Sequence, residues 1–142
     1  MTRQAGAWFA LTAALALHVV DEASNDFLGF YNPMVLRIRD TLGWFPMPTF
    51  TFRPWLIGLT LLVGLLFALT PWAARGSRGA KVAGYAFAAI MLLNGIGHIA
   101  LSIGERRMVA GVWTAPLLLA TSLYQLWALQ STGRVESGSA RR

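Results

Sequence analysis

The stretch LIGLTLLVGLLFALT, residues 56–70, contains no ionisable side chain and lies between Pro54 and Pro71. Proline is tolerated in the first turn of a helix and breaks a helix further along, so these two prolines delimit one helical segment. The segment approaches the roughly 20 apolar residues that a helix needs to cross a lipid bilayer. We therefore predict a membrane-spanning helix over residues 55–74.

Three further apolar stretches of similar length occur in the chain, over residues 5–23, 82–104 and 108–130. Together the four segments predict an all-α integral membrane four-helix bundle in a single domain, residues 1–131. The polar residues 132–142 that follow predict a disordered tail. The composition agrees, because 56% of the 142 residues are apolar and only 13% are charged, which is too few for the surface of a small soluble domain.

The charge and cysteine content exclude several classes of protein. The chain has no cysteine, which excludes a disulfide scaffold, a thiolate zinc site and an iron–sulfur cluster. Its net charge of +6 comes from arginines between the apolar segments rather than along one polar face, so we expect no nucleic-acid partner. Membrane lipids are the expected partners instead.

The distribution of positive charge predicts the orientation. Seven Lys and Arg residues lie in the N-terminus, in the loop after residue 74 and in the tail, against five in the other two connections. The positive-inside rule then predicts both termini in the cytoplasm, in a bacterial-type inner or plasma membrane. The first stretch has a second interpretation, because Arg3 followed by an apolar run is also typical of a secretory signal peptide, and N-terminal sequencing would decide between the two.

The connection between the first two spans, residues 24–54, is long and rich in aromatic side chains. Within it, Asn32 and Pro33 predict the start of an amphipathic helix and Gly43 predicts its end. Aromatic side chains are typical of the membrane–water interface, so we expect this amphipathic, aromatic segment to lie there. It serves either as a lid over the bundle or as an ordinary interfacial loop.

Ionisable side chains interrupt the apolar pattern in two spans. The string HVVDE places His18, Asp21 and Glu22 on one face of the first helix, at spacings i, i+3 and i+4. The third span repeats this theme with Asn94 and His98, again one turn apart. Such side chains are costly inside hydrocarbon and are functional candidates by default.

The two histidines fall at the same predicted depth. The first and third spans run in the same direction, and with the α-helical rise His18 lies about 5 Å, and His98 about 7 Å, beyond the middle of its span. Glu22 lies about 11 Å beyond the middle of the first span. We therefore predict one buried site between these helices, with Thr114 and Thr60 as weaker contributors from the other two spans.

Two chemistries fit this site. In the first, a histidine and a carboxylate act as general acid and base on an apolar or lipid-like substrate. In the second, His18, Glu22 and His98 bind a metal ion, Zn or non-haem Fe, assisted by Asp21 or Glu105. The candidate catalytic residues are His18, Asp21, Glu22, Asn94 and His98, and in the first chemistry Glu22 and His98 are the proton donor and acceptor, His18 and Asp21 their partners, and Asn94 the orienting amide.

The order of these motifs resembles a known family. An HxxEE-like string near the end of a first span, here residues 18–22, followed by NxxxH in a later span, here residues 94–98, is similar to the small integral-membrane proteins of the HXXEE family. The run ERRMVAGVWTAP, residues 105–116, resembles that family's basic turn and the start of its next helix. Asp21 stands where the family has its first glutamate. The resemblance implies a polar site in a membrane protein but no reaction, because the family's function is uncharacterised.

Two further interpretations stay open. The same groups could relay protons in a transporter or channel component, which at this chain length would need a homo-oligomer. Alternatively, the polar network is structural and fixes the register of the helices without catalysis. In that case, substitutions in the network would unfold the protein rather than inactivate it.

Overall fold

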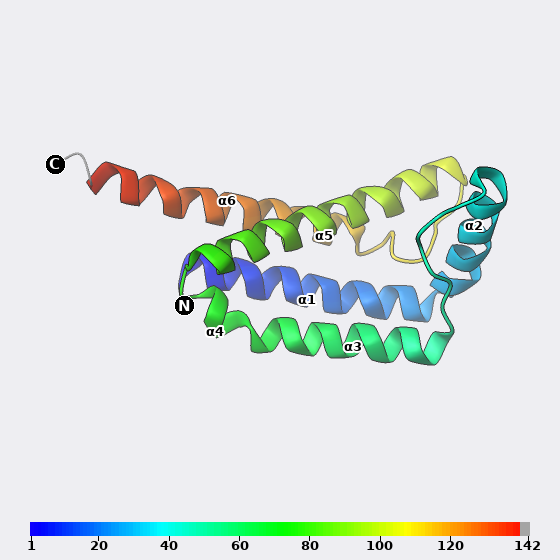
Figure 1. Ribbon diagram of the computed structural model, residues 1–142, viewed down its shortest axis with the longest axis horizontal. Helices are drawn as coiled ribbons and strands as arrows, with labels where there is room; N and C mark the ends of the chain where they lie inside the picture. The colour runs from blue at the N-terminus through cyan, green and yellow to red at the C-terminus, as the bar shows by residue number, and fades with distance from the viewer. Residues whose placement is uncertain (140–142) are drawn as a thin grey trace.

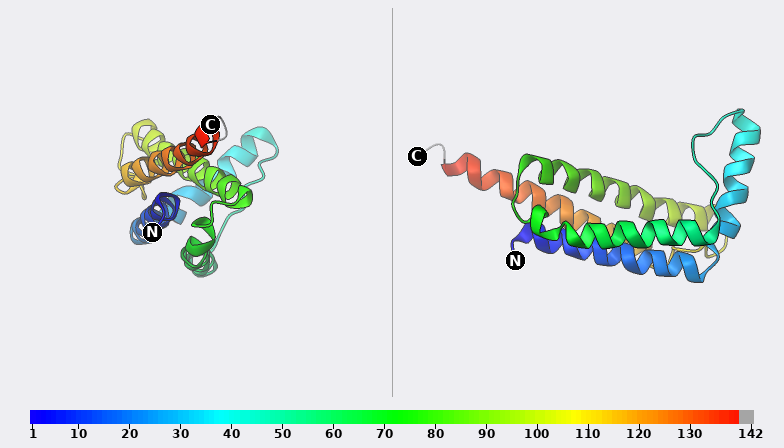
Figure 2. Two further views of the ribbon diagram at one scale, coloured as in Figure 1. Left: turned by 90° about the vertical axis from the view of Figure 1, so that its left-hand side faces the viewer. Right: turned by 60° about the horizontal axis from the view of Figure 1, so that its bottom comes forward.

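The computed structural model describes residues 1–139, and their side chains up to residue 131. Within this part the regular structure is entirely helical, which confirms the all-α prediction. The long helices lie side by side, and a helix of 16 residues stands across the end of the bundle (Figures 1 and 2). The helices are α1 (Arg3–Ser24), α2 (Phe27–Leu42), α3 (Phe52–Ala68), α4 (Thr70–Ala73), α5 (Arg78–Gly104) and α6 (Ala115–Ser139).

Two hydrogen bonds fix α1 against α6. Near one end of the bundle Arg3 donates to Ser131 Oγ (3.0 Å), and at the other end the Thr114 hydroxyl donates to Asp21 Oδ2 (2.9 Å). The two helices are therefore antiparallel, and the residue numbers of facing positions add up to 134 or 135. Between these bonds lies the main apolar core, formed by Trp8, Leu11, Leu15, Phe87, Met91 and Leu118 with their buried neighbours.

α5 and α6 approach each other closely because glycines face the contact. A Cβ added at Gly95 would lie 2.8 Å from Leu119 Cδ2 and 3.1 Å from the backbone oxygen of Ala115. A Cβ at Gly84 would lie 2.9 Å from Gln125 Nε2. Small residues at these positions let two helices pack at short distance, as is common in membrane proteins.

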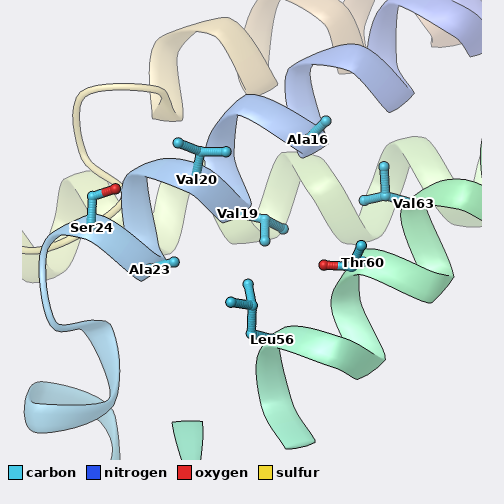
Figure 3. Close-up of a pocket in the computed structure, with 8 residues that line it drawn as sticks. All are labelled: Ala16, Val19, Val20, Ala23, Ser24, Leu56, Thr60 and Val63. Atoms are coloured by element: carbon cyan, nitrogen blue, oxygen red, sulfur yellow. The ribbon is translucent and has the colours of Figure 1, made fainter. Parts of the chain in front are cut away.

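α3 is packed more loosely than the other long helices. It lies along α1, and Trp55 is its one buried residue. Its leucines and isoleucine at positions 57, 61, 62 and 65 are exposed. A groove of about 350 Å³ separates the two helices, with Val19 and Ala23 of α1 facing Leu56 and Thr60 of α3 (Figure 3).

The membrane prediction is only partly supported by the helices themselves. Among the described residues, α5 is the one helix that is both long and apolar enough to cross a membrane, and α3 is apolar but has only 17 residues. Length and composition of one helix are weak support, since core helices of soluble proteins pass the same test. The fold is therefore an all-α bundle, and its four membrane spans stay a prediction.

Two predicted spans need correction at their boundaries. The span predicted over residues 108–130 becomes helical only at Ala115, because the preceding residues form turns in which Gly111 has a φ of +85°. The span predicted over residues 55–74 is divided into α3 and α4. Pro71 lies in the first turn of α4 and has no N–H to continue the hydrogen bonds of α3.

The helix in the connection also starts earlier than its sequence predicts. α2 begins at Phe27, directly after Asp26, so Pro33 lies inside it. Packing stabilises these additional turns of α2, because Leu28, Tyr31 and Val35 are buried with Trp55 in a second apolar cluster. The predicted end is confirmed, since Gly43 is the left-handed C-cap of α2.

At the other end of the chain, the predicted disordered tail over residues 132–142 overlaps α6, which runs to Ser139. The side chains of this tail lie outside the described residues, so its disorder stays a prediction. Both α1 and α5 begin, and α6 ends, at the end of the bundle opposite α2 (Figure 1).

Candidate functional site

Three buried side chains meet where α1 approaches α5. His18 and Glu22 lie one turn apart near the end of α1, with His18 Nε2 at 3.4 Å from Glu22 Oε1. His98 comes from α5, and its Nε2 lies 3.1 Å from the same carboxylate oxygen. The two imidazole rings have their centroids 4.7 Å apart. We call these three residues the histidine site; their potential ligand atoms all lie within 4.8 Å of one another.

A hydrogen-bond chain fixes the tautomer of His18. Asp21 Oδ2 accepts from both the backbone N–H (3.1 Å) and the hydroxyl (2.9 Å) of Thr114, and Asn25 donates to Oδ1 (2.9 Å). The Thr114 hydroxyl has a single proton, and the Asp21 carboxylate accepts it in this hydrogen bond. The Thr114 oxygen, 2.8 Å from His18 Nδ1, is then an acceptor, and His18 carries its proton on Nδ1.

The tautomer of His98 follows from a simpler contact. Its Nδ1 lies 2.7 Å from the backbone oxygen of Ala110. A carbonyl oxygen can only accept, so Nδ1 is the donor and Nε2 of the neutral ring has a free lone pair. That lone pair points toward Glu22.

Three acceptor atoms therefore converge in the histidine site. They are one carboxylate oxygen and, when the two imidazoles are neutral, Nε2 of each ring; His18 Nε2 has no hydrogen-bond partner among the described side chains. Acceptors at such short distances repel one another unless a positive charge lies between them. The arrangement suits either a shared proton or a metal cation.

The turn between α5 and α6 covers both imidazoles with backbone. A Cβ added at Gly111 would lie 2.6 Å from His98 Cε1 and 2.8 Å from His18 Cε1. The positive φ of this residue also favours glycine. Ser102 anchors the turn by accepting from the backbone N–H of Val109 (3.2 Å). Position 111 therefore has two independent reasons to be glycine.

The first turns of α2 cover the site from the outside. The Phe27 ring centroid lies 5.7 Å from that of His98 and 5.9 Å from that of Trp55. Beside it, a shallow groove of about 140 Å³ runs between α2 and α5 and reaches His98. Its walls are mostly apolar: Phe27, Phe30, Tyr31 and Met34 from α2, and Asn94, Gly97, His98 and Leu101 from α5.

The return segment after α2 is held against that helix. Asn32 Nδ2 donates to the Phe50 oxygen (2.9 Å), and the Phe50 N–H donates to Asn32 Oδ1 (3.0 Å). Tyr31 donates to the Pro48 oxygen (3.0 Å), and burial raises the pKa of its phenol, which keeps the donor protonated. Asn32 thus fastens the connection to α2 instead of capping a helix.

The other predicted site residues lie around the histidine site. Asn94 is one turn before His98 but lines the groove toward α2. Thr114 bridges Asp21 and His18, whereas Thr60 faces the groove between α1 and α3 (Figure 3). Glu105 is exposed and lies 3.9 Å from Arg107, away from the ligand atoms.

Sequence reasoning missed the contributions of Ala110 and Gly111. Ala110 acts through its backbone oxygen, which any residue would provide. The available signal was a glycine between two apolar stretches, but the run MVAGVWT is apolar enough to be taken for the start of a spanning helix.

Comparison with known proteins gives one match. The sequence model of a family described as a protein of unknown function with HXXEE motif matches residues 8–125. This range contains both histidines, Asp21, Glu22 and Thr114, and it confirms the resemblance found in the motifs. No curated protein and no solved structure matches the chain.

Proposed function

We propose a function for this chain, which belongs to the HXXEE family, from the chemistry of its own site. The protein is a small membrane enzyme that binds a divalent transition-metal ion through His18, Glu22 and His98 and acts on an apolar or lipid-like substrate. The observation that carries this proposal is the convergence of three buried potential ligand atoms within 4.8 Å of one another, of which His18 Nε2 has no hydrogen-bond partner among the described residues.

The geometry of the three acceptors supports metal binding. Two of the three separations, 3.4 and 3.1 Å between the imidazole nitrogens and Glu22 Oε1, resemble the edge of a coordination tetrahedron, and all three ligand atoms lie within 4.8 Å of one another. That edge is about 3.3 Å for bonds of about 2.0–2.1 Å. Two histidines and one glutamate are a known catalytic zinc set, and two histidines with one carboxylate also suit non-haem iron. When bound, the ion would polarise a substrate oxygen or activate water as a Lewis acid.

The surroundings of the histidines support the same assignment. Metal-binding histidines almost always donate their second ring N–H to a carboxylate, a carbonyl or a water. His98 donates to the Ala110 carbonyl, and His18 donates to Thr114, which is itself bonded to Asp21. These partners orient both rings with the free nitrogen toward Glu22.

The groove between α2 and α5 supports an apolar substrate. Its aromatic wall leads to His98, and the neighbouring outer face of α5 exposes Ile90, Leu93 and Ile96. Soluble monomers rarely expose such a continuous apolar surface. A lipid-like molecule could enter laterally from the bilayer and bring its polar group to the ion while Phe27 and Phe30 bind its apolar part.

Elemental analysis of the protein purified in detergent tests the metal assignment. We expect about one equivalent of zinc or iron per chain in the wild type. His98→Ala and Glu22→Gln should lose the metal while keeping a monodisperse elution profile. Glu105→Gln, in an exposed carboxylate outside the site, is the matched control and should keep the metal.

Two other results would contradict metal binding. A wild-type protein that contains no metal and binds neither Zn²⁺ nor Co²⁺ in titration would leave acid–base catalysis, with a proton shared between Glu22 and His98. Aggregation of both variants would favour a structural network.

Membrane insertion needs its own test. The chain has no cysteine, so single-cysteine variants report topology without background labelling. Arg75 lies in the exposed turn between α4 and α5, and Thr49 lies in the exposed connection between α2 and α3; Figure 1 shows these two connections at opposite ends of the bundle. We expect a membrane-impermeant reagent to label Thr49→Cys, but not Arg75→Cys, in intact cells. Labelling of both variants, or recovery of the chain in the soluble fraction, would contradict the proposed topology.

A further inference from the structure

A second set of polar side chains is buried in the half of the bundle away from the histidine site. Gln4 is 4% exposed, and Ser122 and Gln125 are 0% exposed. The amide atoms of both glutamines and the Ser122 hydroxyl have no hydrogen-bond partner among the described side chains and backbone. An unpaired buried amide or hydroxyl costs roughly 1–3 kcal/mol, so these atoms need a partner that the described residues do not provide.

The register of α1 and α6 brings most of these groups to one level. Because facing positions add up to 134 or 135, Ser122 faces Thr12, which is fully buried and whose hydroxyl donates to the Trp8 oxygen. Gln125 lies one turn further along α6 and faces Gly84 of α5, where the missing side chain leaves room for its amide. We call Thr12, Ser122 and Gln125 the polar layer.

Gln4 continues this layer toward the end of the bundle. It lies near the start of α1, and its Oε1 is 3.8 Å from a Cβ built at Gly76, in the turn before α5. The polar side chains thus extend from the end where α1 begins to about the middle of the bundle.

An apolar layer separates the polar layer from the histidine site. Leu118 and Ser122 are buried one turn apart in α6, and Thr114, directly before the start of α6, lies four residues before Leu118, so that Leu118 is about 6 Å along the axis from each. Leu15 of α1 and Met91 of α5 are buried in the same core cluster as Leu118. Along the bundle, the order is histidine site, apolar layer, polar layer and Gln4.

We propose that the polar layer and Gln4 hold a chain of water molecules that enters at the end of the bundle where α1 begins, and that the apolar layer closes this hydrated half-channel below the histidine site. Water is the fitting ligand because the unpaired atoms include amide donors, amide acceptors and a hydroxyl but no charge. Polar side chains inside a membrane bundle mark paths for water and protons, and apolar constrictions close such paths by excluding water. This inference rests on the proposed membrane location but not on the metal.

Proton permeability of proteoliposomes tests the half-channel. We expect the wild type to be tight, because Leu118 keeps the two polar regions apart. Leu118→Ser should connect them and raise the decay rate of an imposed pH gradient several-fold, as read by a trapped pH-sensitive dye. Adding Gln125→Leu to Leu118→Ser should return the rate close to that of the wild type. Leu117→Ser, on the exposed face of α6, is the matched control and should stay tight.

Two results would overturn the proposal. One is a Leu118→Ser protein that stays as tight as the wild type, and the other is a double variant that leaks as fast as Leu118→Ser alone. Metal analysis of the same samples keeps the proposed function separate, since a change in metal content without a change in permeability concerns only the histidine site.

A measurement of thermal stability in detergent tests the half-channel without measuring proton permeability. If the polar layer is hydrated, Gln125→Leu removes hydrogen bonds to bound water and lowers the unfolding temperature. If the layer is dry, the same substitution removes an unpaired amide and raises that temperature, which would contradict the half-channel.

Discussion

α1 and α3 lie side by side, yet the more apolar helix contributes less to the core. α3 has Arg53 as its one charged side chain and buries only Trp55. α1 contains three ionisable residues near its end and buries them together with Trp8 and Leu11. In this pair of helices, the more apolar one exposes most of its side chains, and the other buries its ionisable side chains beside the apolar core. Such an arrangement agrees with the membrane location that we propose.

The contrast provides controls for experiments. A change in α1, α5 or the turn before α6 can be matched by a similar change in α3, where the same side chain meets open space. If substitutions in α3 lower the stability as much as those in α1 or α5, then α3 is not the loosely packed helix described above.

The largest effect is expected for Gly111→Ala. A non-glycine residue at positive φ costs about 1–3 kcal/mol, and the added methyl group within 2.8 Å of both imidazoles adds overpacking of a similar size. We expect thermal unfolding in detergent at a clearly lower temperature and loss of the bound metal. Gly64→Ala in α3, where a Cβ meets nothing within 4 Å, should change neither.

Leu11→Ala removes a fully buried side chain of the main core. Such truncations cost about 2–5 kcal/mol, because the cavity only partly closes. Leu61→Ala in α3 removes an exposed side chain and should stay within about 0.5 kcal/mol. Unfolding in a graded detergent mixture measures both, and equal losses would show that α3 packs against something in the assembled protein.

Gly95→Ala tests the close approach of α5 and α6. The new methyl group would lie 3.1 Å from the backbone oxygen of Ala115, which cannot rotate away, so we expect a loss of about 1–3 kcal/mol in unfolding free energy. Gly58→Ala in α3 is open on all sides and should gain up to about 1 kcal/mol from helix propensity. A neutral Gly95→Ala would mean that the two helices can separate freely.

Thr114→Val is expected to have the mildest effect. It keeps the shape of the side chain but removes the acceptor for His18 Nδ1 and one donor to Asp21. Loss of such a partner weakens metal binding by about 10–100-fold, measurable by chelator competition. Thr60→Val, in the groove between α1 and α3, should leave the affinity unchanged (Figure 3). An unchanged affinity in Thr114→Val would argue against the chain from Asp21 to the metal.

The meeting of His18 and His98 could be predicted from sequence because the rise of a helix is fixed. To predict that the two histidines lie at equal depth in two parallel helices, only the limits of the two spans were needed. Errors of a few residues in these limits did not change the result. The motif order also sufficed to find the family, which the match over residues 8–125 confirms.

The parts that sequence reasoning missed depend on backbone and on tertiary packing. The contact with Ala110 uses a backbone carbonyl, which every residue has, so the sequence does not indicate it. The residues around Gly111 are apolar, so the sequence does not indicate the turn there. Local preference placed a helix start at Asn32, but burial of Leu28 and Tyr31 against Trp55 outweighs the proline inside α2.

Only Asn25 and Asp26 separate α1 from α2, and Asn25 is bonded to Asp21 by both its backbone and its side chain. The joint is therefore short and stiff. If α2 tilted, the last turn of α1 would rotate with it. Phe27, which covers the histidine site, and the Glu22 carboxylate would then move together. In the membrane location that we propose, with α2 at the interface, changes in bilayer thickness or curvature would reach the histidine site through this joint.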